Sequence, residues 1–224
     1  MKAADGPLPT LGFSEWLRAI GESDADMAVD CGECRGCCTS SYFIHVGPDE
    51  TDALAVIPKR LLFRAPGLAK GHFLIGYSEN GHCAMFRDNA CSIYANRPRA
   101  CRAYDCRVFA ATGLSEEGKP AIARQAERWR FAFPSAEDTR LFEAVREAAR
   151  FLRGHAGEFP AGFLPPNATQ QAALALRVHG LFHRNRKDAA VTVAEIVKAA
   201  GGVNSVVPPG VAGRKTRPRP KKAR

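Results

Sequence analysis

The hydrophobic pattern of the chain differs between its two halves. Up to about residue 115, short apolar runs alternate with turns rich in Gly, Pro and Asn, a pattern typical of short strands and short helices. From Pro120 onward the segments are longer and are bounded by helix-capping residues. The pattern therefore predicts an α+β protein, with short strands in a small core and a helical layer after it.

The residue pattern of the first half predicts short strands, and helices of only one or two turns. We expect a helix that is capped by Ser14 and runs through Glu15–Ile20, with Trp16 and Ile20 facing the core. A strand at Tyr42–Val46 follows, and then a helix that is opened by Pro48 and ends near Val56. After these we expect two strands joined by a turn at 79–81, an extended segment and the start of a helix, at His72–Tyr77, Cys83–Phe86, Cys91–Tyr94 and Arg97–Pro98.

The second half predicts four helices with recognisable ends. They are a helix over 121–130; a helix opened by a capping box at Ser135–Asp138 and continuing to about Arg153, before Gly154; a helix from Asn167 or Thr169 to about His183; and a helix capped at Thr192–Glu195 that ends at 201–202.

These elements suggest four parts of the chain. We expect a disordered N-terminus at 1–13, a cysteine-rich core at 14–115, a helical region packed on it at 116–202, and a disordered basic tail at 203–224. The formal net charge is +9, but seven of the last eleven residues are Lys or Arg, which leaves about +2 for the rest. The tail could make weak, non-specific contact with nucleic acid or an acidic partner, or serve only as a solvated end.

No apolar stretch is long enough to cross a bilayer, and the N-terminus carries Asp5 and Pro7 where a signal peptide needs an apolar run. We therefore expect a cytoplasmic protein with no membrane contact. In that reducing compartment, the eight cysteines of the chain are better explained as metal ligands than as disulfides.

The cysteines form two sets. The first is a C-x-x-C-x-x-C-C run and the second has gaps of seven, nine and four residues; together they are Cys31, Cys34, Cys37, Cys38, Cys83, Cys91, Cys101 and Cys106. Structural zinc and iron–sulfur centres usually take four ligands, so eight thiols fit either two sites or one site with additional structural cysteines. Cys37 and Cys38 point in different directions in almost any conformation, which allows either one structural cysteine or two neighbouring centres. Cys101 and Cys106 lie about 140° apart on an ideal helix, so either that helix ends near Asp105 or the two serve different sites.

The spacing favours an iron–sulfur cluster over zinc, because zinc prefers paired C-x-x-C knuckles and the second set has none. A four-thiolate centre carries about −2 charge, which basic side chains must balance. Five arginines lie among the cysteines, and two tyrosines could donate hydrogen bonds to the sulfurs; they are Arg35, Arg97, Arg99, Arg102 and Arg107, with Tyr94 and Tyr104.

The cysteine run, Gly81-His-Cys83 and the segment Cys91-Ser-Ile-Tyr94-x-x-Arg97-Pro98-x-x-Cys101-Arg102-x-Tyr104-x-Cys106 resemble the CxxCxxCC family of zinc- or iron-chelating proteins. This is the YkgJ-type cysteine-cluster family, to which flagellin lysine N-methylase is related. The resemblance implies metal or iron–sulfur binding by these eight cysteines. It covers about a third of the chain, and Asp105 departs from it where relatives often place proline.

Three functions remain open on this sequence. The first is a metal-binding protein whose centre is structural or transfers metal or electrons. The second is an iron–sulfur-dependent protein-modifying enzyme resembling flagellin lysine N-methylase. The third is a zinc-stapled interaction module whose basic tail contacts nucleic acid or a partner. His179 and His183 have a spacing that can share a metal, but no Glu accompanies them as in H-E-x-x-H. We therefore interpret these two histidines as helix-surface residues. His82 could also bind a metal, but the eight cysteines make it superfluous as a ligand.

Overall fold

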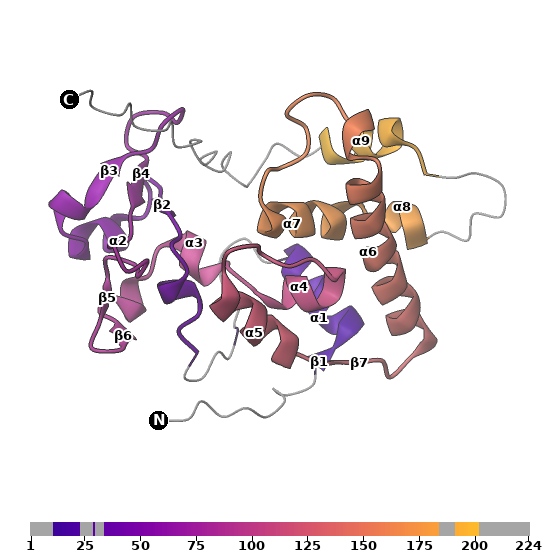
Figure 1. Ribbon diagram of the computed structural model, residues 1–224, viewed down its shortest axis with the longest axis horizontal. Coiled ribbons are helices and arrows are strands. Elements are labelled where there is room, and N and C mark those ends of the chain that lie inside the picture. Colours follow the sequence, from indigo (N-terminus) through magenta and orange to yellow (C-terminus); the bar gives the residue numbers. More distant parts are fainter. Residues whose placement is uncertain (1–10, 23–28, 30–33, 184–190, 202–224) are drawn as a thin grey trace, which may run out of the picture.

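Two separate hydrophobic clusters divide the protein into a part built on a small sheet and a part built from helices (Figure 1). The computed structural model describes residues 11–22, 29, 34–183 and 191–201. Residues 34–103 form the part that we call the sheet lobe, and residues 11–22, 104–183 and 191–201 form the helical lobe. The mixture of short strands and helices confirms the predicted α+β class.

The sheet lobe is organised by three antiparallel strands in the order β2 (Ile44–Val46), β4 (Phe73–Ile75) and β3 (Leu62–Arg64). Ile75 pairs with Ile44 on one side and with Leu62 on the other, so these three side chains share the inner face of the sheet. That face packs on a small core that includes Val46, Ile57 and Met85.

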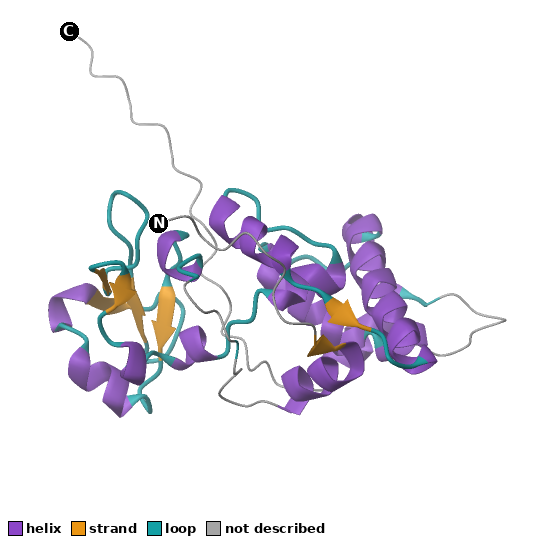
Figure 2. Cartoon of the chain, turned by 90° about the horizontal axis from the view of Figure 1, so that it is seen from below, coloured by secondary structure: helices purple, strands orange, loops and turns teal. Residues whose placement is uncertain are grey.

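Short elements surround this sheet. They are η1 (Cys37–Thr39), α2 (Thr51–Val56), η2 (Lys59–Leu61), β5 (Phe86–Arg87), β6 (Ala90–Cys91), η3 (Tyr94–Asn96) and α3 (Arg99–Arg102). Figure 2, which views the chain from below, shows the sheet at one end of the molecule and the long helices at the other.

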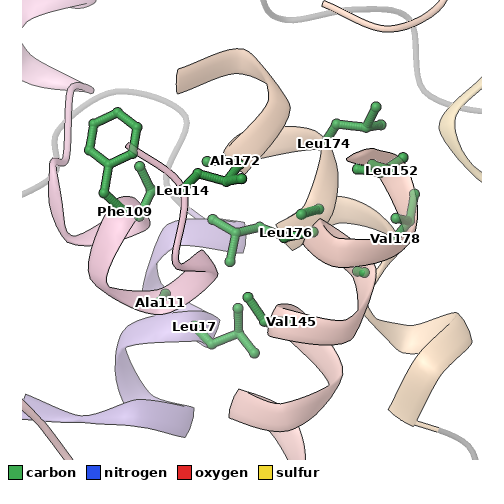
Figure 3. Close-up of a cluster of buried hydrophobic side chains, with 14 of the residues drawn as sticks. Leu17, Phe109, Ala111, Leu114, Val145, Leu152, Ala172, Leu174, Leu176 and Val178 are labelled. Atoms are coloured by element: carbon green, nitrogen blue, oxygen red, sulfur yellow. The ribbon is translucent and has the colours of Figure 1, made fainter. Parts of the chain in front are cut away.

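The helical lobe buries a larger core between helices that are far apart in sequence. Its elements are β1 (Leu11–Gly12), α1 (Phe13–Glu22), α4 (Arg107–Thr112), α5 (Pro120–Arg128), β7 (Phe131–Ala132), α6 (Ala136–Gly154), η4 (Ala156–Glu158), α7 (Ala168–Val178), α8 (Gly180–His183) and α9 (Val193–Gly201). In Figure 3, Leu17 of α1, Val145 of α6 and Leu176 of α7 converge on one another. Helix α1 thus belongs to the helical core, although its sequence precedes the cysteines.

The caps that the sequence predicts from local residue patterns are present. Ser135 caps α6 with Asp138 in a reciprocal capping box, and the side chain of Asn167 caps α7 by accepting a hydrogen bond from the backbone N–H of Gln170. Trp16 is buried in the helical core, as expected.

Elements that depend on distant partners differ from the prediction. Helix α1 begins at Phe13 and not after Ser14, because β1 pairs in parallel with β7 and places Phe13 in the core. The predicted helix ending at His183 is divided into α7 and α8 at His179. Strand β3 was not predicted, and Cys83 joins Tyr77 through one β-bridge and not through a full strand.

None of the helices within the described residues is both long and apolar enough to cross a membrane. The predicted basic tail at 203–224 and residues 1–10 of the predicted N-terminal segment lie outside the described residues. Residues 11–13 of that segment are described, and they belong to β1 and to the start of α1.

We predict that Asp138 makes the stability of the helical lobe dependent on pH. The Ser135 hydroxyl and the backbone N–H of Ser14 donate to this carboxylate and hold its pKa well below its usual range. Because the charged form is favoured by folding, its contribution is present at neutral pH and is lost as the pH falls below the ordinary aspartate pKa of 3.8. Asp138→Asn should therefore lower the melting temperature at pH 7, with a smaller difference from wild type at pH 3.

Thermal melts followed by circular dichroism from pH 3 to pH 7 check this expectation. Glu143→Gln removes an exposed carboxylate from the same helix and should follow the wild-type profile. A gap between Asp138→Asn and wild type that stays constant across this range would contradict the assignment.

Candidate metal centre

Cys38 and Cys83 are brought together by backbone pairing between two distant segments. The N–H of Cys83 donates to the carbonyl of Cys38 at 2.8 Å, and the N–H of Ser41 donates to the carbonyl of Gly81 at 2.9 Å. Gly81 has a φ of +80°, and a Cβ there would lie 2.6 Å from the Ser41 hydroxyl oxygen. A glycine is therefore required where the cysteine run meets the second set of cysteines.

Cys91 is returned toward Cys83 by a tight hairpin. Asp88 and Asn89 both have positive φ, 49° and 58°, as a two-residue hairpin turn requires. Phe86 pairs with Cys91 across this hairpin, and the guanidinium Nε of Arg35 donates to the carbonyl of Asn89 at 2.9 Å. Arg35 thus ties the first cysteine run to the turn of the hairpin.

Cys101 approaches from the short helix α3. Its thiol interacts electrostatically with the thiols of Cys38, Cys83 and Cys91. These four residues, Cys38, Cys83, Cys91 and Cys101, are called the four-cysteine group below. Cys34 lies beside it, since its thiol acts on that of Cys38, and the backbone N–H of Gly36 donates to the Cys34 sulfur at 3.4 Å.

The remaining predicted ligands lie elsewhere. Cys37 is exposed, and its charge acts on Tyr42 and Tyr104, so Cys37 and Cys38 point apart as the sequence indicates. Cys106 is buried in the helical core, where its sulfur accepts a hydrogen bond from the indole N–H of Trp129 at 3.3 Å. Cys31 lies outside the described residues.

Burial dominates the electrostatics of the four-cysteine group. It raises the pKa of the Cys38 thiol to about 11, with further increases from Cys91 and Cys83, while Arg35 acts in the opposite direction. Burial likewise raises the pKa of Cys101 and of Cys83, and Arg97 lowers that of Cys101. Burial therefore favours the protonated thiols of Cys38, Cys83 and Cys101, and metal binding there has to displace those protons.

Four of the five arginines of this region divide into two kinds, and the fifth, Arg102, donates to the carbonyl of Arg97. Arg35 and Arg97 act on thiols of the four-cysteine group, so they are placed to balance its charge. Arg97 also stacks on the ring of Tyr94, with its guanidinium carbon 3.8 Å from the ring centroid. Arg99 and Arg107 instead form ion pairs with Asp49 and Asp105, an outcome that sequence spacing did not reveal.

A cluster of polar groups that the sequence did not indicate joins the two lobes beside Cys37. The hydroxyls of Tyr42 and Tyr104 are 3.2 Å apart, and burial raises the pKa of Tyr42 to about 12. The Lys119 ammonium of α5 donates to the carbonyl of Ser40 at 2.7 Å and lies 4.2 Å from the centroid of the Tyr42 ring. Helix α5 is thereby attached to the residues that follow the cysteine run.

Asp105 connects the segment between Cys101 and Cys106 to the N-terminal helix. Its carboxylate accepts from the indole N–H of Trp16 at 2.9 Å and forms a buried ion pair with Arg107 at 2.8 Å. Helix α3 ends at Arg102 and α4 begins at Arg107, so the helix is interrupted between the two cysteines. The residue that departs from the family pattern is therefore a structural one.

The donor set fits a soft metal or cluster, because thiolates are the ligands that zinc and iron–sulfur centres prefer. Within residues 11–22, 34–183 and 191–201, no three Cys, His, Asp or Glu side chains are arranged to hold a single metal ion. The four thiols are thus electrostatic neighbours without being in the close tetrahedral contact of a single-ion site.

Comparison with protein families agrees with this geometry. Residues 30–125 match the CxxCxxCC family, described as "Putative zinc- or iron-chelating domain". The matched residues cover the sheet lobe, α4 and most of α5, and they include all eight cysteines. The resemblance predicted from the cysteine spacing is confirmed, and the domain supports metal chelation as the property of this region.

No curated protein and no solved structure matched the chain. The three histidines that the sequence analysis considered as ligands have partners outside the four-cysteine group. His183 contacts Glu137 at 3.0 Å, His179 contacts the carbonyl of Leu176, and His82 packs edge-on against Phe86.

We predict that Asp105→Ala destabilises the protein by about 3–5 kcal/mol, because the buried guanidinium of Arg107 would lose its counter-charge. Urea denaturation of the fully loaded protein, followed by tryptophan fluorescence, measures this loss. Asp49→Ala breaks the exposed pair with Arg99 and should cost much less, since exposed ion pairs are screened by water. Equal losses in the two variants would show that Asp105 has no special structural role.

Proposed function

We propose that the protein binds an iron–sulfur cluster through Cys38, Cys83, Cys91 and Cys101, with zinc as the alternative occupant. The observation that carries this proposal is the convergence of four thiols from the cysteine run, the hairpin and α3. Disulfide chemistry does not account for this arrangement, because none of the described cysteines forms a disulfide.

The spacing of the cysteines supports a cluster over a single zinc ion. Zinc prefers paired C-x-x-C knuckles, and the second set of cysteines, with gaps of seven, nine and four residues, provides none. The C-x-x-C-x-x-C run is instead the spacing with which a bacterial ferredoxin-like iron–sulfur motif opens.

The charge of the surroundings also supports a four-thiolate centre. Four thiolates around a divalent metal or a cluster of charge +2 leave about −2, which is costly to bury without counter-charges. Arg35 and Arg97 act on two of the four thiols and supply two positive charges. Arg35 also donates to the hairpin turn, so the same side chain positions one ligand segment and balances charge.

Cys34 is the first candidate for an additional or replacement ligand, because it lies next to Cys38. Cys37 and Cys106 belong in this proposal to the interface between the lobes, where both act on Tyr104. A bound centre would hold three chain segments together and could exchange an electron. The two alternative functions require different metals, because the protein-modifying enzyme needs an iron–sulfur cluster and the zinc-stapled module needs zinc. The identity of the metal is therefore the first property to measure.

We predict that protein purified without oxygen is brown and contains about four irons and four acid-labile sulfides per chain, as one four-iron cluster requires. Elemental analysis, sulfide determination and visible absorption give this result directly. Removal of the metal with a chelator should lower the melting temperature, because the three ligand segments lose their common attachment. A colourless protein with one zinc per chain and no sulfide would replace the iron–sulfur assignment with the zinc one.

We further predict that alanine at any residue of the four-cysteine group reduces the metal content to less than about half, because four-coordinate thiolate sites need each ligand. Cys106→Ala is the matched control, since it removes a thiol from the helical core and not from the group. It should retain the wild-type metal content and lose some stability. Loss of metal from Cys106→Ala in a protein whose circular dichroism is unchanged would refute this ligand set.

A further inference from the structure

The sheet of the sheet lobe has an outer face that is not an ordinary solvated face. His45, Leu74 and Phe63 are cross-strand partners, and they alternate with the inward-facing Ile44, Ile75 and Leu62. The outer face of such a sheet is usually polar when it faces water. Here Leu74 is only 4% exposed and belongs to neither hydrophobic core, so the middle of this face is not open to water.

Three aromatic rings gather at one end of this outer face. Phe43, Phe63 and Tyr77 are 48%, 42% and 42% exposed. The ring centroid of Phe43 lies 5.0 Å from that of Tyr77 and 5.8 Å from that of Phe63. The planes of the Phe43 and Phe63 rings are nearly perpendicular, at 86°, so the two rings do not stack face to face. We call these three residues the aromatic patch.

Gly76 makes room for the patch. A Cβ at this position would lie 3.3 Å from the Phe63 ring and 3.9 Å from the Phe43 ring. The two rings therefore lie directly over the backbone at Gly76, the residue after β4. The N–H of Ala84 donates to the carbonyl of this glycine. This contact fixes the rings on a rigid part of the hairpin that also carries Cys83.

The segment that carries Phe63 and Tyr77 is basic. Between Asp52 and Glu79 the sequence has no acidic residue and four basic ones, which are all exposed: Lys59, Arg60, Arg64 and Lys70. Lys59 and Arg60 form the turn η2 that leads directly into β3. The segment thus places positive charge beside exposed rings.

The carboxylates nearest the other end of the outer face are already paired. His45 Nε2 and His72 Nδ1 lie 2.9 Å apart there, near Asp49 and Glu50. Asp49 pairs with the Arg99 guanidinium, and Glu50 accepts from the backbone N–H groups of Gly47 and Arg99. These acids therefore do not offset the basic segment at the aromatic patch.

Exposed aromatic rings beside Lys and Arg are the combination that binds single-stranded nucleic acid, because bases stack on the rings and cations contact the phosphates. We propose that the outer face of the β2–β4–β3 sheet binds single-stranded nucleic acid. Phe43, Phe63 and Tyr77 stack on successive bases, and Lys59 and Arg60 contact the backbone phosphates. This binding is independent of the metal centre and of the basic tail.

Tryptophan substitution tests the stacking directly. Phe63→Trp in the full chain, loaded with its metal, places an indole in the patch, and oligothymidylate of about ten nucleotides should quench its emission. Phe133→Trp is the matched control, because Phe133 is similarly exposed, at 43%, but lies in the helical lobe. Quenching in both variants or in neither would overturn the proposal.

Affinity measurements separate the patch from the tail, which is the same in every variant. By fluorescence anisotropy with the labelled oligonucleotide, Phe43→Leu and Phe63→Leu should each weaken binding about fivefold or more. Phe133→Leu should bind like wild type, and Lys59→Ser/Arg60→Ser should reduce the salt dependence of binding. Wild-type affinity in both patch variants, with circular dichroism and metal content unchanged, would show that the tail alone holds the oligonucleotide and would overturn the proposal.

Discussion

The buried carboxylate of Asp105 is the constraint that fixes the point at which the chain leaves the sheet lobe and enters the helical lobe. It receives hydrogen bonds from Trp16 of the first helix and from Arg107 of α4, and it follows α3 by only a few residues. A buried ion pair of this kind contributes little net stability but is costly to break, so it fixes one arrangement of the chain and penalises others. As a result Cys101 remains with the sheet lobe while Cys106 enters the helical core.

The sheet lobe has few means of stability other than its cysteines. Its strands are three residues long or shorter, and its buried core is much smaller than that of the helical lobe. A sheet of this size with so little apolar burial is marginal on its own. The metal centre proposed above would join the cysteine run, the hairpin and α3, and would thereby add to the stability of this lobe.

Sequence reasoning succeeded where the signal is local and failed where it depends on distant contacts. The caps at Ser135 and Asn167 and the divergence of Cys37 from Cys38 follow from a few neighbouring residues. Strand β3 is too short to show alternation, and its pairing with β4 is long-range. The start of α1 at Phe13, the pairing of Arg107 with Asp105 and the burial of Cys106 all depend on packing between helices that no spacing rule describes.

Two successive turns of the sheet lobe carry thiols and an aromatic ring close together in sequence. Tyr77 and Cys83 pair across the turn that follows β4, and Cys91 lies in the next hairpin, whose turn has positive φ at Asp88 and Asn89 and accepts a hydrogen bond from Arg35. The Tyr77 ring is exposed and lies against Phe43, whereas the thiols of Cys83 and Cys91 act on Cys101. Because the ring and the thiols face different neighbours, a change confined to a ring should leave the thiols in place. The rings can therefore be altered to test the outer face of the sheet separately from the four-cysteine group.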